Sequence, residues 1–138
     1  MEAVSAADVE FVRERVELFF RNERDAAMAR WAEDCISIPP AQWPESERAE
    51  GRDAVRAVFD GFDEAFGHDW PTQMEISRIE DAGDGQVLLE FAWNPSGISS
   101  GIPLDQAITA VYTVRDGKIA KGEFFMSYEE GRKAAGLA

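Results

Sequence analysis

Cysteine is almost missing from this sequence, and long apolar runs are missing altogether. Cys35 is the only cysteine among 138 residues, which excludes an internal disulfide bond and a cysteine-based zinc cluster. No apolar run approaches the ~18 to 20 residues that a membrane span requires. Residues 1–10 lack the basic segment and following apolar stretch that mark a secretory signal. We therefore expect a soluble protein that stays in the cytoplasm.

Basic residues are also scarce. Lysine and arginine total 14 against 27 aspartates and glutamates, which gives a formal net charge of −13. A field of this sign repels phosphate, so we expect neither nucleic acid nor a membrane surface as a partner. The sequence shows no metal-ligand cluster, phosphate-binding loop or nucleophile triad, so we expect no metal and no cofactor.

What the chain does contain is enough apolar material for one packed core. Hydrophobic residues make up 45% of the sequence and aromatic residues 11%, which is ordinary for a globular protein. A chain of this length corresponds to one domain and buries about two-thirds of its unfolded surface. We therefore expect residues 1–138 to form a single domain.

The period of the apolar residues changes in the middle of the chain. The first half has helical spacing, which predicts helices 5–22, 24–32 and 52–66, with a short strand at 35–38. The second half has a period near two, which predicts strands 73–81, 86–94, 104–114 and 119–126.

Turn and cap residues separate the last elements. Asp116-Gly117 can supply the positive φ values of a tight hairpin turn, so the charged stretch around it is interpreted as a turn. Ser127 with Glu130 forms a capping box that begins a short C-terminal helix. The order of elements predicts an α+β domain whose helices pack on one face of an antiparallel sheet.

Three segments carry a resemblance to a known family: the helix start "GRDAVRAVF", the hairpin and loop "DAGDGQVLLEFAWNPSGISSG", and the closing "VRDGKIAKGEFFMSYEEGRKAAGL". Together with the order of elements, they resemble the SnoaL-like branch of the nuclear transport factor 2-like superfamily. The resemblance covers residues 9–137. It implies a cone-shaped α+β barrel, in which three N-terminal helices pack on a curved mixed or antiparallel sheet, with a pocket at the open end.

The superfamily includes ketosteroid isomerases, polyketide cyclases, epoxide hydrolases, dehydratases and non-enzymatic members, so the fold alone does not give the reaction. The resemblance also implies a homodimer. We expect such a dimer to form through the outer face of the sheet, because Thr109, Val111 and Thr113 form a β-branched row there.

Alternation along the predicted strands separates an inner face from an outer face. The last strand places Phe124 and Met126 inside, with Ile119, Lys121 and Glu123 outside. The inner rows are rich in aromatic and aliphatic side chains, which suits an apolar ligand, including a polycyclic one. A collapsed core without a cavity is the alternative. The residues expected to contact a ligand are Trp31, Trp43, Phe59, Phe62, Trp70, Trp93, Gln106, Ile108, Ala110, Phe124 and Met126.

Arg15 is the candidate catalytic residue that stands out on the first helix. Its neighbours at helical spacing are apolar, among them Phe11, Val12 and Phe19. A guanidinium in such an arc either extends to water, which is the commoner arrangement, or meets a buried acceptor. In the second case it offers a fixed donor to an anionic or carbonyl ligand, or pairs with Asp34.

The resemblance also tests one mechanism. In ketosteroid isomerases the position of Arg15 carries a tyrosine that donates to the developing oxyanion. Their general base falls on Pro39 here, and their protonated aspartate falls on Ala110. These departures argue against that mechanism, because proline and alanine have no group that can exchange a proton. The Asp–Arg–Asp arrangement of the epoxide hydrolases has no clear counterpart either.

Asp34, Tyr112 and His68 are the other candidate catalytic residues. His68 stands beside Asp69, a pairing typical of an oriented general base, although a surface histidine is the alternative. Asp34 precedes the first strand, where a cap or turn role is the commoner one. Two functions stay open: an isomerase, cyclase or dehydratase acting on an apolar molecule, and a non-catalytic module for ligand binding or dimerisation.

Overall fold

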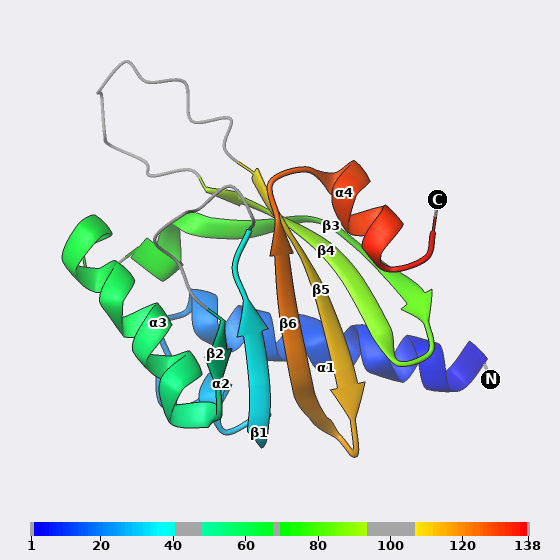
Figure 1. Cartoon of the computed structure of the whole chain (residues 1–138), viewed down its shortest axis with the longest axis horizontal. Helices are drawn as coiled ribbons and strands as arrows, with labels where there is room; N and C mark the ends of the chain where they lie inside the picture. Colours follow the sequence, from blue (N-terminus) through cyan, green and yellow to red (C-terminus); the bar gives the residue numbers. More distant parts are fainter. Residues whose placement is uncertain (1, 41–47, 68–69, 94–106, 138) are drawn as a thin grey trace.

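The computed structural model describes residues 2–40, 48–67, 70–93 and 107–137. Its strands form a sheet, most of the helices pack on one face of this sheet, and the short C-terminal helix covers part of the other face (Figure 1). In chain order they are α1 (Glu2–Phe20), α2 (Arg24–Met28), β1 (Trp31–Ile38), β2 (Ala49–Glu50), α3 (Arg52–Phe66), the 3-10 helix η1 (Trp70–Gln73), β3 (Met74–Gly83), β4 (Gln86–Trp93), β5 (Ala107–Arg115), β6 (Lys118–Phe125) and α4 (Tyr128–Ala134).

The described strands form one six-stranded sheet in the order β2-β1-β6-β5-β4-β3. The last four strands make the antiparallel meander that the sequence predicts, and β1 pairs with β6 in parallel. The mixed α+β fold class is therefore confirmed. The sheet has two free ends, at β2 and β3, so the described strands do not close into a barrel.

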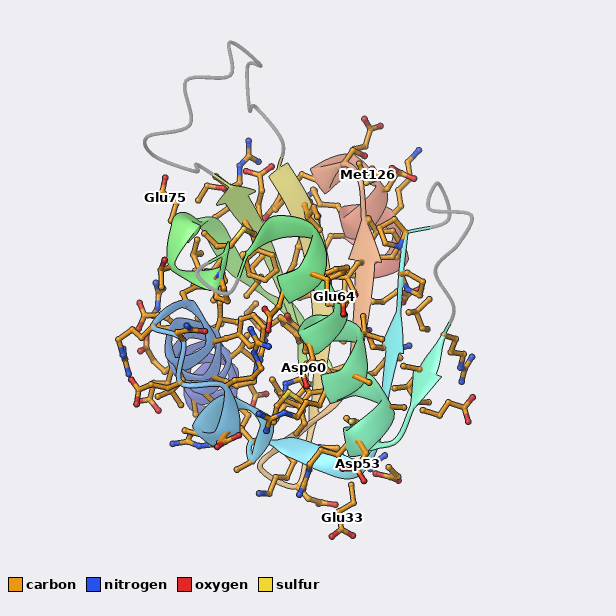
Figure 2. The ribbon with its side chains drawn as sticks, turned by 90° about the vertical axis from the view of Figure 1, so that its left-hand side faces the viewer. Glu33, Asp53, Asp60, Glu64, Glu75 and Met126 are labelled. Carbon is orange, nitrogen blue, oxygen red and sulfur yellow. The ribbon has the colours of Figure 1, made fainter. Side chains whose placement is uncertain are left out.

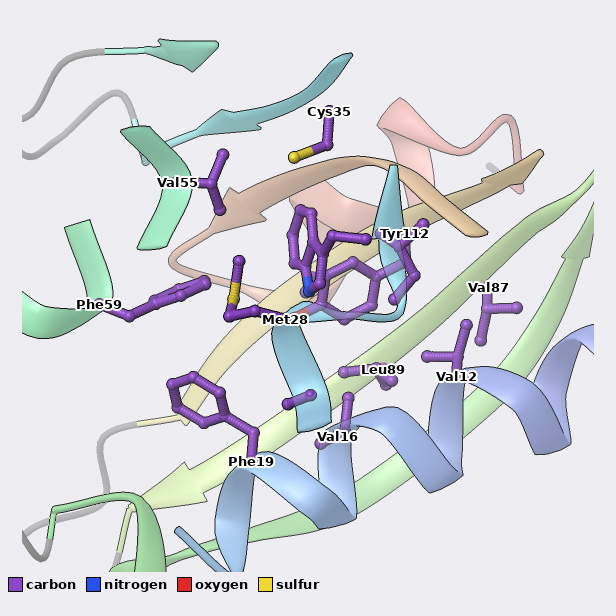
Figure 3. Close-up of a cluster of buried hydrophobic side chains, with 14 of the residues drawn as sticks. Val12, Val16, Phe19, Met28, Cys35, Val55, Phe59, Val87, Leu89 and Tyr112 are labelled. Atoms are coloured by element: carbon purple, nitrogen blue, oxygen red, sulfur yellow. The ribbon is translucent and has the colours of Figure 1, made fainter. Parts of the chain in front are cut away.

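The inner face of the sheet carries the main core. Val87, Leu89 and Phe91 of β4 and Tyr112 of β5 lie there, as alternation predicts, and pack against Val16 of α1. Figure 3 shows Val16, Val87, Leu89 and Tyr112 of this core, together with labelled side chains of α3 and β1. Phe19 and Phe59 meet edge to face with ring centroids 5.0 Å apart, which joins α1 to α3.

The outer face of the sheet is covered in part by α4, whereas α1 lies across the opposite face (Figure 1). Leu88 and Val111 are buried there against Ala135. The helix comes close because Gly131 has no side chain, since a Cβ atom at this position would lie 2.4 Å from Cγ2 of Thr109. The prediction that the helices share one face is therefore wrong for α4. Thr109 and Val111 are buried beneath it and do not form an open β-branched row.

The second helix is shorter than its apolar pattern predicts. It ends at Met28, and Trp31 and Ala32 already belong to β1. Long-range contacts account for this, because the carbonyl oxygen of Arg30 accepts a hydrogen bond from the backbone N–H of Ile119 at 2.9 Å. The strand β6 thus draws this segment into the sheet.

A β-bulge changes the face of two residues at the start of β6. Thr113 pairs with Lys121 and Val114 pairs with Ile119, so Ala120 is the extra residue. As a result Ile119 is fully buried in the main core, and the prediction that it faces outward is wrong. A second irregularity lies in β3, where the register with β4 shifts between Ile76 and Arg78.

Acidic side chains are distributed over the outside of the molecule. Figure 2 labels Asp53, Asp60 and Glu64 along α3, which faces the viewer, and Glu33 and Glu75 near the edge of the view; all five residues are exposed. These carboxylates are therefore in contact with solvent. Within the described ranges, no helix combines the length and apolar character needed to cross a membrane.

Candidate functional site

A cavity of about 500 Å³ lies between α1, α3 and the inner face of the sheet. Its volume is in the range of pockets that hold small organic ligands. Most of the wall is aromatic or aliphatic, and the lining residues are Arg15, Val16, Phe19, Phe20, Ser37, Pro39, Pro40, Arg48, Ala49, Ala54, Val58, Phe59, Phe62, Met74, Phe91, Ile108, Tyr112 and Phe124.

The aromatic rings of the wall hold one another in place. Phe20 meets Phe91 edge to face with centroids 5.5 Å apart, and Tyr112 meets Phe124 in the same way at 6.1 Å. Such pairs are worth about 0.5–1.5 kcal/mol each beyond the area they bury. The wall is therefore preorganised by contacts between α1 and three strands.

Arg15 brings a positive charge into this apolar wall. It is 2% exposed, and its guanidinium carbon lies 5.0 Å from the ring centroid of Trp31 and 4.8 Å from that of Tyr112. Its Nε and Nη1 atoms are buried and have no hydrogen-bond partner in the described part of the chain. The side chain therefore neither extends to water nor forms the ion pair with Asp34 that the sequence left open.

Burial shifts the pKa values of the Arg15 guanidinium and of the Tyr112 hydroxyl, which lie side by side. Desolvation lowers the pKa of Arg15, and the contact with the Tyr112 hydroxyl opposes this in part. Desolvation raises the pKa of Tyr112, and the nearby guanidinium opposes that shift. An arginine stays charged in proteins, so at neutral pH the pair consists of a cation and a neutral phenol. Both groups can donate hydrogen bonds.

Gly122 makes room for this arrangement. A Cβ atom at Gly122 would lie 2.9 Å from a ring carbon of Trp31 and 2.9 Å from one of Tyr112. Any larger residue in the middle of β6 would push apart the two rings that hold the guanidinium. The glycine is therefore part of what positions Arg15.

Acidic groups are absent from the described lining of the cavity. Its polar residues are Arg15, Ser37, Arg48 and Tyr112, and none of the described lining residues is an aspartate, a glutamate or a histidine. In the ranges that the structure covers, no group of three or more His, Cys, Asp or Glu side chains is placed to hold a metal ion. The site as described offers donors and apolar surface.

A comparison with known protein families decides the identity of the chain. The family described as the SnoaL-like domain matches residues 12–122. The chain belongs to this family. A comparison with curated proteins gives no match.

Solved structures share the fold of this SnoaL-like domain at low sequence identity. The protein Bal32a from a soil-derived mobile gene cassette is 17% identical with a TM-score of 0.68, and the match covers 87% of this chain and 88% of that one. A proposed polyketide cyclase from Sinorhizobium meliloti is 18% identical, with a TM-score of 0.60 and coverage of 83% and 93%. A proposed isomerase from Bacillus subtilis is 20% identical, with a TM-score of 0.63 and coverage of 97% and 96%.

The structure brings together several of the side chains that the sequence selects. Arg15 and Tyr112 line the cavity, as do Phe59, Phe62, Ile108 and Phe124. Trp31 is fully buried against Arg15, and Ala110 is fully buried in the core without lining the cavity. Pro39, one of the positions compared above with the ketosteroid isomerases, does line it.

Two predicted residues lie elsewhere. Asp34 is exposed, and its Oδ1 atom accepts a hydrogen bond from Nη2 of Arg115 at 2.8 Å, so it does not reach the cavity. Met126 follows the end of β6 beside α4 (Figure 2) and is not among the described lining residues. Its place outside the regular strand removes it from the inner row.

The remaining predicted residues cannot be compared with the cavity. Trp43, His68 and Gln106 lie outside the described residues. Trp70 belongs to η1 and Trp93 to β4, but the description covers only their backbone.

Sequence reasoning missed Ser37, a buried residue of β1 that lines the cavity. The signal was present, because Ser37 follows Cys35 at a spacing of two in the predicted strand, and Cys35 is an apolar residue of the core. Phe20 was also missed as a lining residue, although it follows Phe19 at the end of the predicted helix.

Proposed function

We propose that this SnoaL-like domain binds a small, predominantly apolar molecule in the cavity and acts on it as an isomerase, cyclase or dehydratase. The observation that carries the proposal is the cavity of about 500 Å³, with an aromatic wall and one buried pair of polar donors. The proposed cyclase and isomerase among the structural neighbours are compatible with this class of reaction.

Arg15 and Tyr112 would stabilise negative charge on an oxygen atom of the substrate. Donors that are fixed in a site with little water stabilise a developing oxyanion far more than donors in water do. The rings of Trp31 and Tyr112 hold the guanidinium in place before any ligand enters. None of the described lining residues offers the carboxylate or imidazole that could act as a general base like that of the ketosteroid isomerases.

Ligand binding without turnover is the second candidate function. It is favoured by the same lack of a carboxylate or imidazole among the described lining residues. Conversion of a bound ketone that is lost in Arg15→Met would favour the enzyme, whereas binding without conversion would favour the binding module. Dimerisation through the outer sheet face remains part of this second proposal, with the surface around α4 and β6 in place of the buried Thr109 and Val111.

Binding of a neutral fluorescent probe tests the proposal. N-phenyl-1-naphthylamine fluoresces strongly in apolar surroundings, and we expect it to bind saturably with one site per chain. Val58 lines the cavity, so Val58→Trp should fill part of it and weaken binding by about tenfold, a loss of about 1.4 kcal/mol.

Ala57→Trp is the matched control. Ala57 lies on the same helix, is exposed and is not among the described lining residues, so a tryptophan there should leave binding unchanged. The proposal fails if the probe shows no saturable binding, or if both tryptophan variants behave like the original chain.

A further inference from the structure

Several arginines form ion pairs in the structure, and Arg15 differs from them. Arg24, for example, donates to Asp60 at 2.6 Å and to Asp63 at 2.9 Å, and Arg115 donates to Asp34. No carboxylate of the described residues lies within 4.0 Å of the Arg15 guanidinium, although Arg15 is the more deeply buried side chain. The cavity wall therefore contains a positive charge without a counter-ion from the described chain.

An uncompensated buried charge is costly. Transfer of an ion from water to a protein interior costs several kcal/mol after relaxation, and it is usually offset by an ion of opposite sign. The contacts with Trp31 and Tyr112 offset part of this cost, by about 2 kcal/mol for each ring. A ligand that brings a negative charge to Arg15 would remove the remaining cost, so the free site favours an anion.

The surroundings of Arg15 restrict what kind of anion fits. The Tyr112 hydroxyl is a second donor beside the guanidinium, whereas Phe19, Phe59, Phe91 and Phe124 provide apolar wall around it. A small hydrated anion would leave this wall uncovered. An anionic group on an apolar, ring-containing body satisfies both parts of the cavity at once.

We propose that the ligand of this cavity is an apolar organic anion, whose carboxylate or enolate oxygen binds the guanidinium of Arg15 and the hydroxyl of Tyr112 while its rings contact the aromatic wall. This inference rests on the proposed function and names the class of its ligand. A carboxylate brings its charge with it, and an enolate acquires that charge during reaction. The two sources share the same contact, because each presents an anionic oxygen to two donors.

Two isosteric probes test the inference: 2-naphthoate, which is anionic, and 2-naphthamide, which is neutral. Their affinities are measured by displacement of N-phenyl-1-naphthylamine. A hydrogen bond to a charged group contributes about 1.5–3 kcal/mol, so we expect naphthoate to bind at least about tenfold more tightly than naphthamide. Arg15→Met should remove this preference while affinity for naphthamide changes by less than about threefold.

Arg115→Met is the matched control, because Arg115 is an exposed arginine that does not line the cavity. It should keep the full preference for naphthoate. Equal affinity of the unchanged chain for both probes, or a preference that survives Arg15→Met, would overturn the inference.

The result separates this inference from the proposed function. If the neutral reporter binds and Val58→Trp weakens it, but naphthoate and naphthamide bind equally, the cavity holds apolar ligands without selecting anions. If neither the reporter nor the two probes bind, both proposals fall. Preference for naphthoate without any turnover supports the anion site within the binding module.

Discussion

Arg15 and Arg24 show two opposite ways to place a guanidinium against the same core. Arg24 contacts the Phe19 ring and bridges Asp60 and Asp63, and hydrogen bonding to Asp63 is the main cause that raises its pKa. Arg15 contacts two rings but no described carboxylate, and burial lowers its pKa. Arg24 is therefore expected to stabilise the fold. Arg15 is expected to lower the stability of the fold while it provides a hydrogen-bond donor in the cavity wall.

This difference predicts opposite effects of methionine at the two positions. Arg15→Met should raise the free energy of unfolding by about 1–3 kcal/mol, because it replaces an uncompensated buried charge with an apolar chain of similar length. Arg24→Met should lower it by about 1–2 kcal/mol, because it removes the ion pairs that Arg24 makes with Asp60 and with the part-buried Asp63. Urea unfolding of the three proteins measures both changes. A loss of stability in Arg15→Met similar to that in Arg24→Met would contradict the assignment.

The sequence could select Arg15 but could not determine its surroundings. Helical spacing places Arg15 among apolar neighbours, which is why it stood out. Whether its head reaches water depends on Trp31 and Tyr112, which come from two distant strands, and on the missing side chain of Gly122. Asp34 carries the carboxylate that could have paired with Arg15, and it lies next to the predicted first strand in sequence. In the structure this carboxylate accepts a hydrogen bond from Arg115 instead.

At the scale of elements, α4 is fastened to the outer face of the sheet by a small polar cluster. The Tyr128 hydroxyl donates to Glu80 of β3, and Arg132 donates to the same carboxylate at 3.1 Å. The guanidinium of Arg78 lies 4.5 Å from the Tyr128 ring centroid. The N-cap Ser127 accepts a hydrogen bond from the backbone N–H of Glu130 at 3.1 Å, as the capping box predicts.

This cluster predicts a loss of stability at alkaline pH. Burial, followed by the hydrogen bond to Glu80, raises the pKa of Tyr128 to about 12. Since the folded chain favours the protonated phenol, its contribution is complete below the unfolded pKa of about 10 and disappears as pH rises toward 12. Tyr128 is partly exposed, so we expect a loss of about 1 kcal/mol.

Urea unfolding at pH 9 and pH 11.5 measures this loss, and Tyr128→Phe is the control. The phenylalanine variant lacks the titrating group, so its stability should fall less between the two pH values. Equal losses in the two proteins would show that the phenol does not contribute.

The bounds and faces of the elements were predicted well where residues close in sequence determine them. They were predicted less well where contacts between distant segments determine them. The hairpin at Asp116-Gly117 has positive φ at both residues, 53° and 71°, as its sequence predicts. The early end of α2 depends on pairing with β6, and the face of Ile119 depends on one extra residue at Ala120. One extra residue in a strand exchanges the inward-facing and outward-facing positions on one side of it. The alternation of apolar and polar residues alone does not reveal such an extra residue.

At the scale of the whole molecule, the proposed anion site lies inside a strongly acidic protein. The net charge is −13. Exposed acids such as Asp53, Asp60 and Glu64 belong to α3, and this helix also forms one wall of the cavity. The long-range field therefore repels the class of ligand that the buried Arg15 favours. The two effects act at different distances, because salt screens exposed charges strongly and buried ones weakly.

This separation predicts an unusual dependence on ionic strength. The association rate constant of 2-naphthoate should increase a few-fold between 10 and 150 mM salt, as the Debye length falls from about 30 to about 8 Å and the repulsion is screened. The rate constant for 2-naphthamide should not change, since a neutral probe does not feel the field. Stopped-flow displacement of N-phenyl-1-naphthylamine measures both. A naphthoate rate constant that falls with salt would mean that the entrance attracts anions, and that the exposed acids lie too far from it to govern entry.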